Sequence, residues 1–162
     1  MTKYALAAAI LLSSALTAHA DECGNTTLPE GAVPYTKAQA SHAFSGKTWL
    51  WDDGGAYFSP KGKFVAISGS HKSYGKGTWS ASDDGKVCYD ADWKSPTGNG
   101  PYSDCRALVK TKDRQYDSST NGDDKGKWWC SEASRQGLFS KLKPGDKITP
   151  KLAAFIKENA IQ

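Results

Sequence analysis

The clearest pattern in the chain is the strict alternation of apolar and polar residues over positions 86–93. The apolar face of this segment carries every second residue, namely Val87, Tyr89, Ala91 and Trp93. The segment 75–81 alternates in the same way, with Trp79 on its apolar face. Because successive side chains of a strand point to opposite faces, both segments are predicted to be strands with one aromatic face and one wet face.

Short aromatic and β-branched runs continue through the middle of the chain, separated by turn-forming Gly, Asp, Asn and Pro residues. They predict strands near 47–51, 55–59, 63–68, 75–81, 86–93, 103–111, 113–117 and 126–132. A sheet with one aromatic face buries that face by closing on itself. The predicted fold class is therefore mainly β, a small antiparallel lipocalin-like β-barrel of roughly six to eight strands.

Helices are predicted on both sides of this β-rich region. Thr36 is a favourable N-cap for a short N-terminal helix over residues 37–44. Thr149 followed by Pro150 is typical of the start of a C-terminal helix. The apolar stripe of that second helix, which we expect to dock on the sheet, consists of Leu152, Phe155 and Ile156.

The first twenty residues have the composition of a secretory signal peptide. Lys3 precedes the apolar stretch 5–16, and Ala18-His19-Ala20 is a small-x-small cleavage site. The alternative is an uncleaved membrane anchor, for which the apolar stretch is short. We expect a periplasmic or secreted protein with no membrane span, composed of a signal peptide at 1–20, an irregular tail at 21–34 and a single β-rich domain at 35–162.

The charge of the chain does not indicate a nucleic-acid partner. Residues 1–20 hold one of the 21 Lys and Arg residues and none of the 17 acidic ones, so cleavage leaves a net charge of +3. The basic residues are interspersed with acidic ones, and no basic stripe is formed.

The four cysteines, Cys23, Cys88, Cys105 and Cys130, form an even set in an oxidising destination and predict two disulfides with three possible connectivities. Two neighbouring predicted strands favour Cys88–Cys105, which leaves Cys23–Cys130. This choice has a difficulty, because Cys88 lies on a polar strand face, whereas Cys105 lies on the same strand face as the apolar Ala107. A bulge or a strand-end placement would be needed to bring the two cysteines together. No C-x-x-C spacing indicates zinc.

Several segments of the chain resemble a known protein family. They are residues 46–49 (GKTW), 55–64 (GAYFSPKGKF), 77–79 (GTW), 86–89 (KVCY) and Cys105. The ordered set resembles an uncharacterised family of exported proteobacterial proteins, domain of unknown function 995. The resemblance implies a β-rich domain and a periplasmic or secreted location, and no known activity. Cys23 and Cys130 are an additional pair relative to the family's pattern.

No motif for catalysis is apparent. His42 and His71 are the histidines beyond the predicted cleavage site, and neither lies in a nucleophile motif. The carboxylate pairs 52–53 and 90–92 lie in a turn and on a wet strand face, respectively. We therefore expect no catalytic residue and no enzymatic activity.

A calcium loop is the one metal motif to consider. Asp117, Ser119 and Asn121 match the opening of an EF-hand loop, but its twelfth position is Trp128 instead of Glu. A long hairpin turn is the preferred interpretation, so we expect no metal and no cofactor.

Aromatic residues give the main indication of function. Trp49, Trp51, Trp79 and Trp93 are predicted to line the barrel, while Trp128 and Trp129 are adjacent on a strand and must point to opposite faces. One of this last pair is the predicted surface contact. The expected partner is a small apolar or glycan-like ligand in the barrel mouth, or a cell-envelope protein.

The sequence thus favours an exported, non-enzymatic periplasmic binding or cell-envelope accessory protein. The alternative is a secreted, disulfide-stapled inhibitor or effector of another enzyme. In that case the predicted loop 94–103, which is stiffened by Pro and Gly and carries Tyr102, would contact the target.

Overall fold

The computed structural model describes residues 27–28, 30–121, 125–130 and 138–162. The predicted signal peptide and Cys23 lie outside the described residues. No helix in these ranges combines the length and the apolar character needed to cross a membrane.

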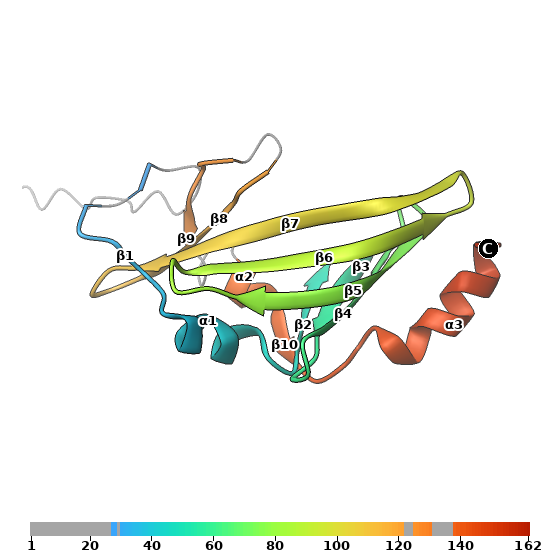
Figure 1. Cartoon of the computed structure of the whole chain (residues 1–162), viewed down its shortest axis with the longest axis horizontal. Coiled ribbons are helices and arrows are strands. Elements are labelled where there is room, and N and C mark those ends of the chain that lie inside the picture. The colour runs from blue at the N-terminus through green and yellow to red at the C-terminus, as the bar shows by residue number, and fades with distance from the viewer. Residues whose placement is uncertain (1–26, 29, 122–124, 131–137) are drawn as a thin grey trace, which may run out of the picture.

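A single antiparallel sheet makes up most of the described chain (Figure 1). Its strands are β1 (Val33–Pro34), β2 (Lys47–Trp51), β3 (Gly54–Phe58), β4 (Lys63–Ser68), β5 (Ser73–Ala81), β6 (Lys86–Ser95), β7 (Gly98–Lys110), β8 (Gln115–Ser119), β9 (Trp129–Cys130) and β10 (Leu142–Pro144). The strand order is β10-β2-β3-β4-β5-β6-β7-β8-β9, and β1 pairs with β7 just beyond the first residue of β6. The sheet curls into a half-barrel, which confirms the mainly antiparallel β class predicted from the alternation.

The alternation predicted for β5 and β6 is present in the structure. Val87 and Ala91 are buried on the concave face, whereas Asp90 and Asp92 are exposed on the convex face. On β5, a Cβ atom at Gly77 would lie 1.8 Å from the carbonyl oxygen of Asp90. Only glycine permits this approach of two backbones, and it lets the sheet curl tightly here.

The predicted disulfide between Cys88 and Cys105 is present. The two residues are direct partners in an unbroken β6–β7 register, with Cα atoms 4.0 Å apart. No bulge is needed, because the register places Cys105 and Ala107 on the convex face and Arg106 on the concave face, paired with Val87. The assumption that Ala107 marks the inward face of β7 was wrong.

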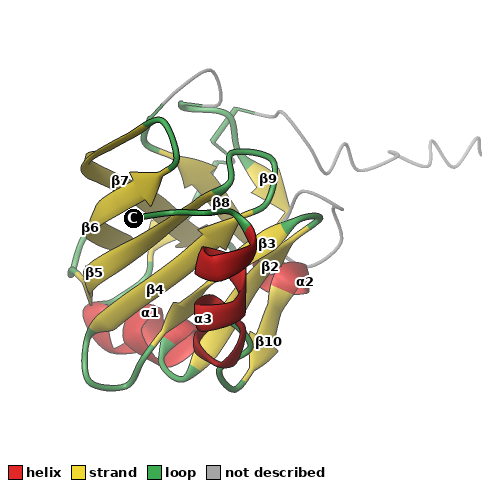
Figure 2. Ribbon diagram, turned by 90° about the vertical axis from the view of Figure 1, so that its right-hand side faces the viewer, coloured by secondary structure: helices red, strands yellow, loops and turns green. Residues whose placement is uncertain are grey.

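Within the described ranges, three helices cover the ends and the outer face of the sheet: α1 (Lys37–Phe44), α2 (Leu138–Lys141) and α3 (Thr149–Glu158). A capping box at Thr36 and Gln39 begins α1, whose Phe44 is fully buried in the core within the curl. The C-terminal helix α3 lies across the convex face (Figure 2), where Leu152 packs with Ile67 and Tyr74, as its apolar stripe predicts.

The predicted loop 94–103 is instead a long hairpin. Strand β6 continues to Ser95 and β7 begins at Gly98, so the turn contains only two residues. The Ser95 hydroxyl closes it by accepting from the Gly98 N–H at 3.1 Å. Pro101 is tolerated in the strand because this half of β7 pairs with β6 alone, and its other edge needs no N–H donor.

Candidate functional site

A cavity of about 570 Å³ lies at the end of the half-barrel opposite α1. The last residues of β2 and β4 and the turn of the β6–β7 hairpin lie at this end. Its aromatic lining consists of Trp49, Trp51, Phe64, Tyr89, Trp93 and Tyr102. Ser68, His71 and Ser73, at and beside the β4–β5 turn, add a polar rim. The curl of the sheet therefore gathers aromatic rings from β2, β4, β6 and β7 around one hollow.

Ring packing fixes the walls of this cavity. Trp49 and Trp51 lie on the same face of β2 and meet edge to face, with ring centroids 5.5 Å apart. The Phe64 and Tyr89 rings are stacked with centroids 4.3 Å apart and an interplanar angle of 4°. Such contacts fix the orientation of the rings.

Trp93 occupies the space that a side chain at position 75 would take. The two residues are direct partners in the β5–β6 ladder, and a Cβ atom at Gly75 would lie 2.7 Å from the Trp93 ring. The indole therefore lies flat across the glycine, and its position depends on the missing Cβ.

The indole N–H groups of Trp49 and Trp93 are buried and have no acceptor among the residues that the structure describes. A buried donor without a partner costs about 1–3 kcal/mol. Both indoles belong to the cavity lining, so the cavity walls contain two unsatisfied donors.

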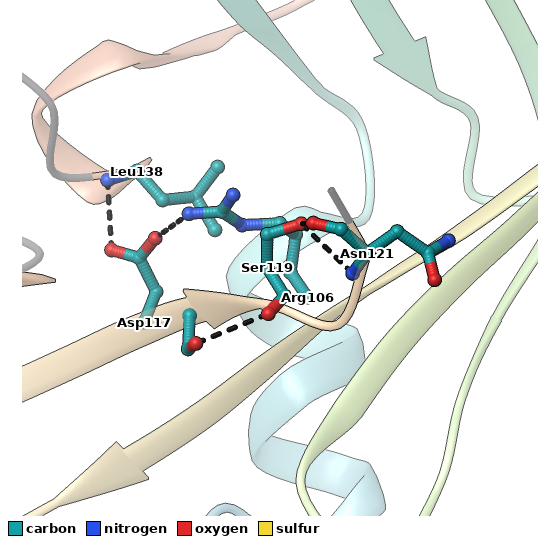
Figure 3. Close-up of polar contacts among 6 residues, drawn as sticks. Arg106, Asp117, Ser119, Asn121 and Leu138 are labelled. Carbon is teal, nitrogen blue, oxygen red and sulfur yellow. Dashed lines mark hydrogen bonds and ion pairs between the residues drawn. The ribbon is translucent and has the colours of Figure 1, made fainter. Parts of the chain in front are cut away.

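A buried ion pair borders the aromatic lining. Asp117 of β8 is fully buried and accepts from Nη2 of Arg106 and, at 3.0 Å, from the backbone N–H of Leu138 (Figure 3). The Arg106 guanidinium also lies 5.4 Å from the centre of the Trp49 ring. One carboxylate therefore connects α2, β7 and β8 and indirectly positions Trp49.

Burial raises the pKa of two acidic groups next to the cavity. It raises the pKa of Tyr89, and the nearby carboxylate of Asp104 adds to this effect. Burial also raises the pKa of Asp104 itself, although the N–H of Cys105 donates to its carboxylate at 2.7 Å and partly opposes the shift. A charged Asp104 is thus disfavoured by the fold.

The Asp104→Asn variant is expected to be more stable than the parent at pH 7 by about 1 kcal/mol or less. A carboxyl whose pKa is raised on folding contributes stability below its ordinary pKa, and this contribution is lost as the pH rises through the raised value. The advantage of asparagine should therefore vanish at pH 3. Urea unfolding at both pH values measures the difference, and Asp92→Asn, on the exposed face, should show no such gain.

The structure brings four of the predicted aromatic residues together, since Trp49, Trp51, Trp93 and Tyr102 all line the cavity. Trp79 lies outside it and is partly buried against the core, where its indole N–H donates to the Ser59 carbonyl at 2.8 Å and its ring meets Phe58 edge to face.

Trp128 and Trp129 also lie outside the cavity, and both are half-buried. Trp129 belongs to β9 and pairs with Asp117. Cys130 is buried and disulfide-bonded, while its predicted partner Cys23 lies outside the described residues, so the pairing of these two cysteines stays a prediction.

The sequence reading missed the polar residues of the concave face, Asp104 and Arg106. Both occupy the same alternate positions as Tyr102 and Leu108, which is a usable signal, because it predicts one strand face with an aromatic residue at one end and a leucine at the other. It was overlooked because two charged side chains at alternate positions are typical of a solvent-facing strand.

The residues of the calcium motif do not converge on one point. The Asp117 carboxylate is bound by Arg106 and the Leu138 N–H, whereas the Ser119 hydroxyl bonds with the main chain of Asn121 (Figure 3). In the described part of the chain, no three His, Cys, Asp or Glu side chains are grouped to hold a metal ion.

The fold and the cavity define the class of protein: a curled antiparallel half-barrel with an aromatic hollow at one end. The chain belongs to the family described as protein of unknown function DUF995, whose model matches residues 7–148. This confirms the family resemblance noted in the sequence. Comparison with curated proteins and with solved structures finds no match.

Proposed function

We propose that this protein is an exported, non-enzymatic binding protein that holds a small apolar or sugar-like ligand in the aromatic cavity. The observation that carries the proposal is the cavity of about 570 Å³ lined by three tryptophans, two tyrosines and a phenylalanine. Volumes of about 300–1,000 Å³ with mainly apolar walls are typical of sites for small molecules.

The chemistry of the lining supports binding rather than catalysis. The carboxylates at positions 52, 53, 90 and 92 are exposed, in a turn or on the convex face. The rim residue His71 is exposed as well. Flat aromatic rings stack on apolar rings and on the C–H faces of sugars, which suits a carrier.

The Trp93→Ala variant is expected to bind N-phenyl-1-naphthylamine, an uncharged aromatic dye, about tenfold more weakly than the parent, equivalent to about 1.4 kcal/mol. Loss of the indole removes one wall of the cavity. Gly75→Ala should also weaken binding, because the added Cβ displaces the Trp93 ring. Fluorescence titration of the dye measures both effects.

Trp128→Ala is the matched control, since it removes an indole outside the cavity. Equal dye affinity in the parent, Trp93→Ala and Gly75→Ala proteins would contradict the proposed site. A parallel titration with N,N′-diacetylchitobiose separates the two ligand classes, because a carrier for apolar compounds binds the dye alone.

Export is tested separately by the mass of the purified protein, which should correspond to a chain that begins at Asp21.

The inhibitor interpretation is the second candidate, and one observation favours it. Tyr102 is 49% exposed and lies on the half of β7 whose outer edge pairs with no strand among the described residues. An enzyme target would contact this edge, and Tyr102→Ala would then abolish its capture while the β6–β7 hairpin remains intact.

A further inference from the structure

A second cavity, of about 500 Å³, lies at the other end of the half-barrel, between α1 and the turn that joins β7 to β8. It shares no lining residue with the aromatic cavity. The cationic side chains in its lining are Lys110, Lys112 and Arg114, and His42 of α1 adds an imidazole. Among the described residues of the lining, Asp113 is the only acidic one.

Hydrogen bonds within the turn fix the backbone that carries these cations. The Thr111 hydroxyl accepts from the N–H of Arg114 at 3.1 Å, and the Thr111 N–H donates to the Arg114 carbonyl at 2.9 Å. Lys110 and Lys112 flank Thr111, so the turn presents two ammonium groups from one short segment.

The charge of these lysines is not neutralised within the described part of the chain. The ion pairs found there are Lys86–Asp84 and Arg106–Asp117, and neither involves Lys110 or Lys112. The ammonium group of Lys110 lies instead 5.8 Å from the centre of the Tyr35 ring. Two unpaired ammonium groups beside one hollow make it favourable for an anion.

An aromatic wall lies beside these cations. The rings of Tyr35 and Phe139 are stacked, with centroids 6.0 Å apart and an interplanar angle of 25°, and both line the cavity. Phe139 is half-buried, so part of its surface is open to a ligand. The hollow therefore offers positive charge and a flat apolar surface side by side.

We propose that this second cavity is a separate binding site for a small organic anion with a flat apolar body. Its carboxylate, sulfonate or phosphate group lies against Lys110 and Lys112, and its ring lies against Phe139. The site is independent of the aromatic cavity and of the function proposed for it.

The test uses the mature protein and 8-anilinonaphthalene-1-sulfonate, an anionic aromatic dye. The double variant Lys110→Gln, Lys112→Gln is expected to bind this dye about tenfold more weakly than the parent. Lys151→Gln, which removes an exposed lysine of α3, is the single-charge control and should stay within about twofold. Asp113→Asn removes the opposing charge and should tighten binding by about two- to threefold.

The outcomes distinguish this site from the aromatic cavity. Trp93→Ala should leave binding of the anionic dye unchanged while weakening N-phenyl-1-naphthylamine. If Trp93→Ala abolishes binding of the anionic dye, or if the double lysine variant binds it as well as the parent, the proposal is wrong. Asp113→Asn keeps the test decisive should the lysine variant fold poorly, because unchanged or weaker binding by Asp113→Asn contradicts the proposal.

Discussion

The Asp117→Ala variant is expected to lose about 3–5 kcal/mol of free energy of unfolding. The substitution leaves the Arg106 guanidinium, which is only 13% exposed, without the carboxylate that now pairs with it. It also leaves the buried N–H of Leu138 without the oxygen that it reaches at 3.0 Å. A buried charge and a buried donor that lose their partner each add a desolvation penalty.

Urea unfolding measures this loss, and Asp92→Ala, which removes an exposed carboxylate, should change stability by no more than about 0.5 kcal/mol. A double variant, Arg106→Met with Asp117→Leu, should recover most of the loss, because apolar residues of similar size replace buried ion pairs well. A cost below about 1 kcal/mol for Asp117→Ala would show that the pair is hydrated in solution.

The second large effect concerns the disulfide. The double variant Cys88→Ala, Cys105→Ala is expected to lose about 3 kcal/mol, because a cross-link between residues 17 positions apart restricts the unfolded chain by about this amount. The paired strands should still form, since the β6–β7 register continues on both sides of the bond.

Urea unfolding of the double variant is preferable to treatment with a thiol, because a thiol acts on all four cysteines. Binding of N-phenyl-1-naphthylamine serves as the control for an intact cavity and should change by less than about twofold. Unchanged stability in the double variant would mean that the unfolded chain is already restricted near these residues.

The sequence predicted the structure well where a short stretch of residues alone determines it. Alternation in β5 and β6 predicted which face is buried, and the N-cap at Thr36 predicted the start of α1. The disulfide between Cys88 and Cys105 also followed from two adjacent strands. In these cases the side-chain period or a short-range hydrogen bond decides the outcome, and both are visible in the sequence.

The sequence was less informative where contacts between distant residues decide the position of a side chain or the extent of a strand. Arg106 is acceptable on the concave face only because Asp117, eleven residues later, neutralises it there. Trp79 can pack against the core because the Ser59 carbonyl accepts its N–H. Residues 98–103 form a strand, although they include Gly and Pro, because residues 90–95 of β6 supply a full set of partners. No local rule contains these contacts.

The four residues Trp49, Trp51, Trp93 and Tyr102 were predicted as binding residues from their aromatic character alone. Their convergence on one hollow required the order of the strands, because they come from three strands of the sheet. Tyr89 and Phe64, which the sequence did not single out as binding residues, complete the lining, and their rings are stacked on each other.

The open path of the sheet has a consequence for how a ligand exchanges. The terminal strands β9 and β10 contain two and three residues, whereas β6 and β7 contain ten and thirteen and are cross-linked. Displacing the short β10 breaks few main-chain hydrogen bonds, and β10 pairs with β2, which carries Trp49 and Trp51. The wall formed by Trp93 and Tyr102 is rigid by comparison. For the ligand proposed above, entry and release are therefore expected to proceed through the β2 side, where displacement of β10 separates only three residue pairs.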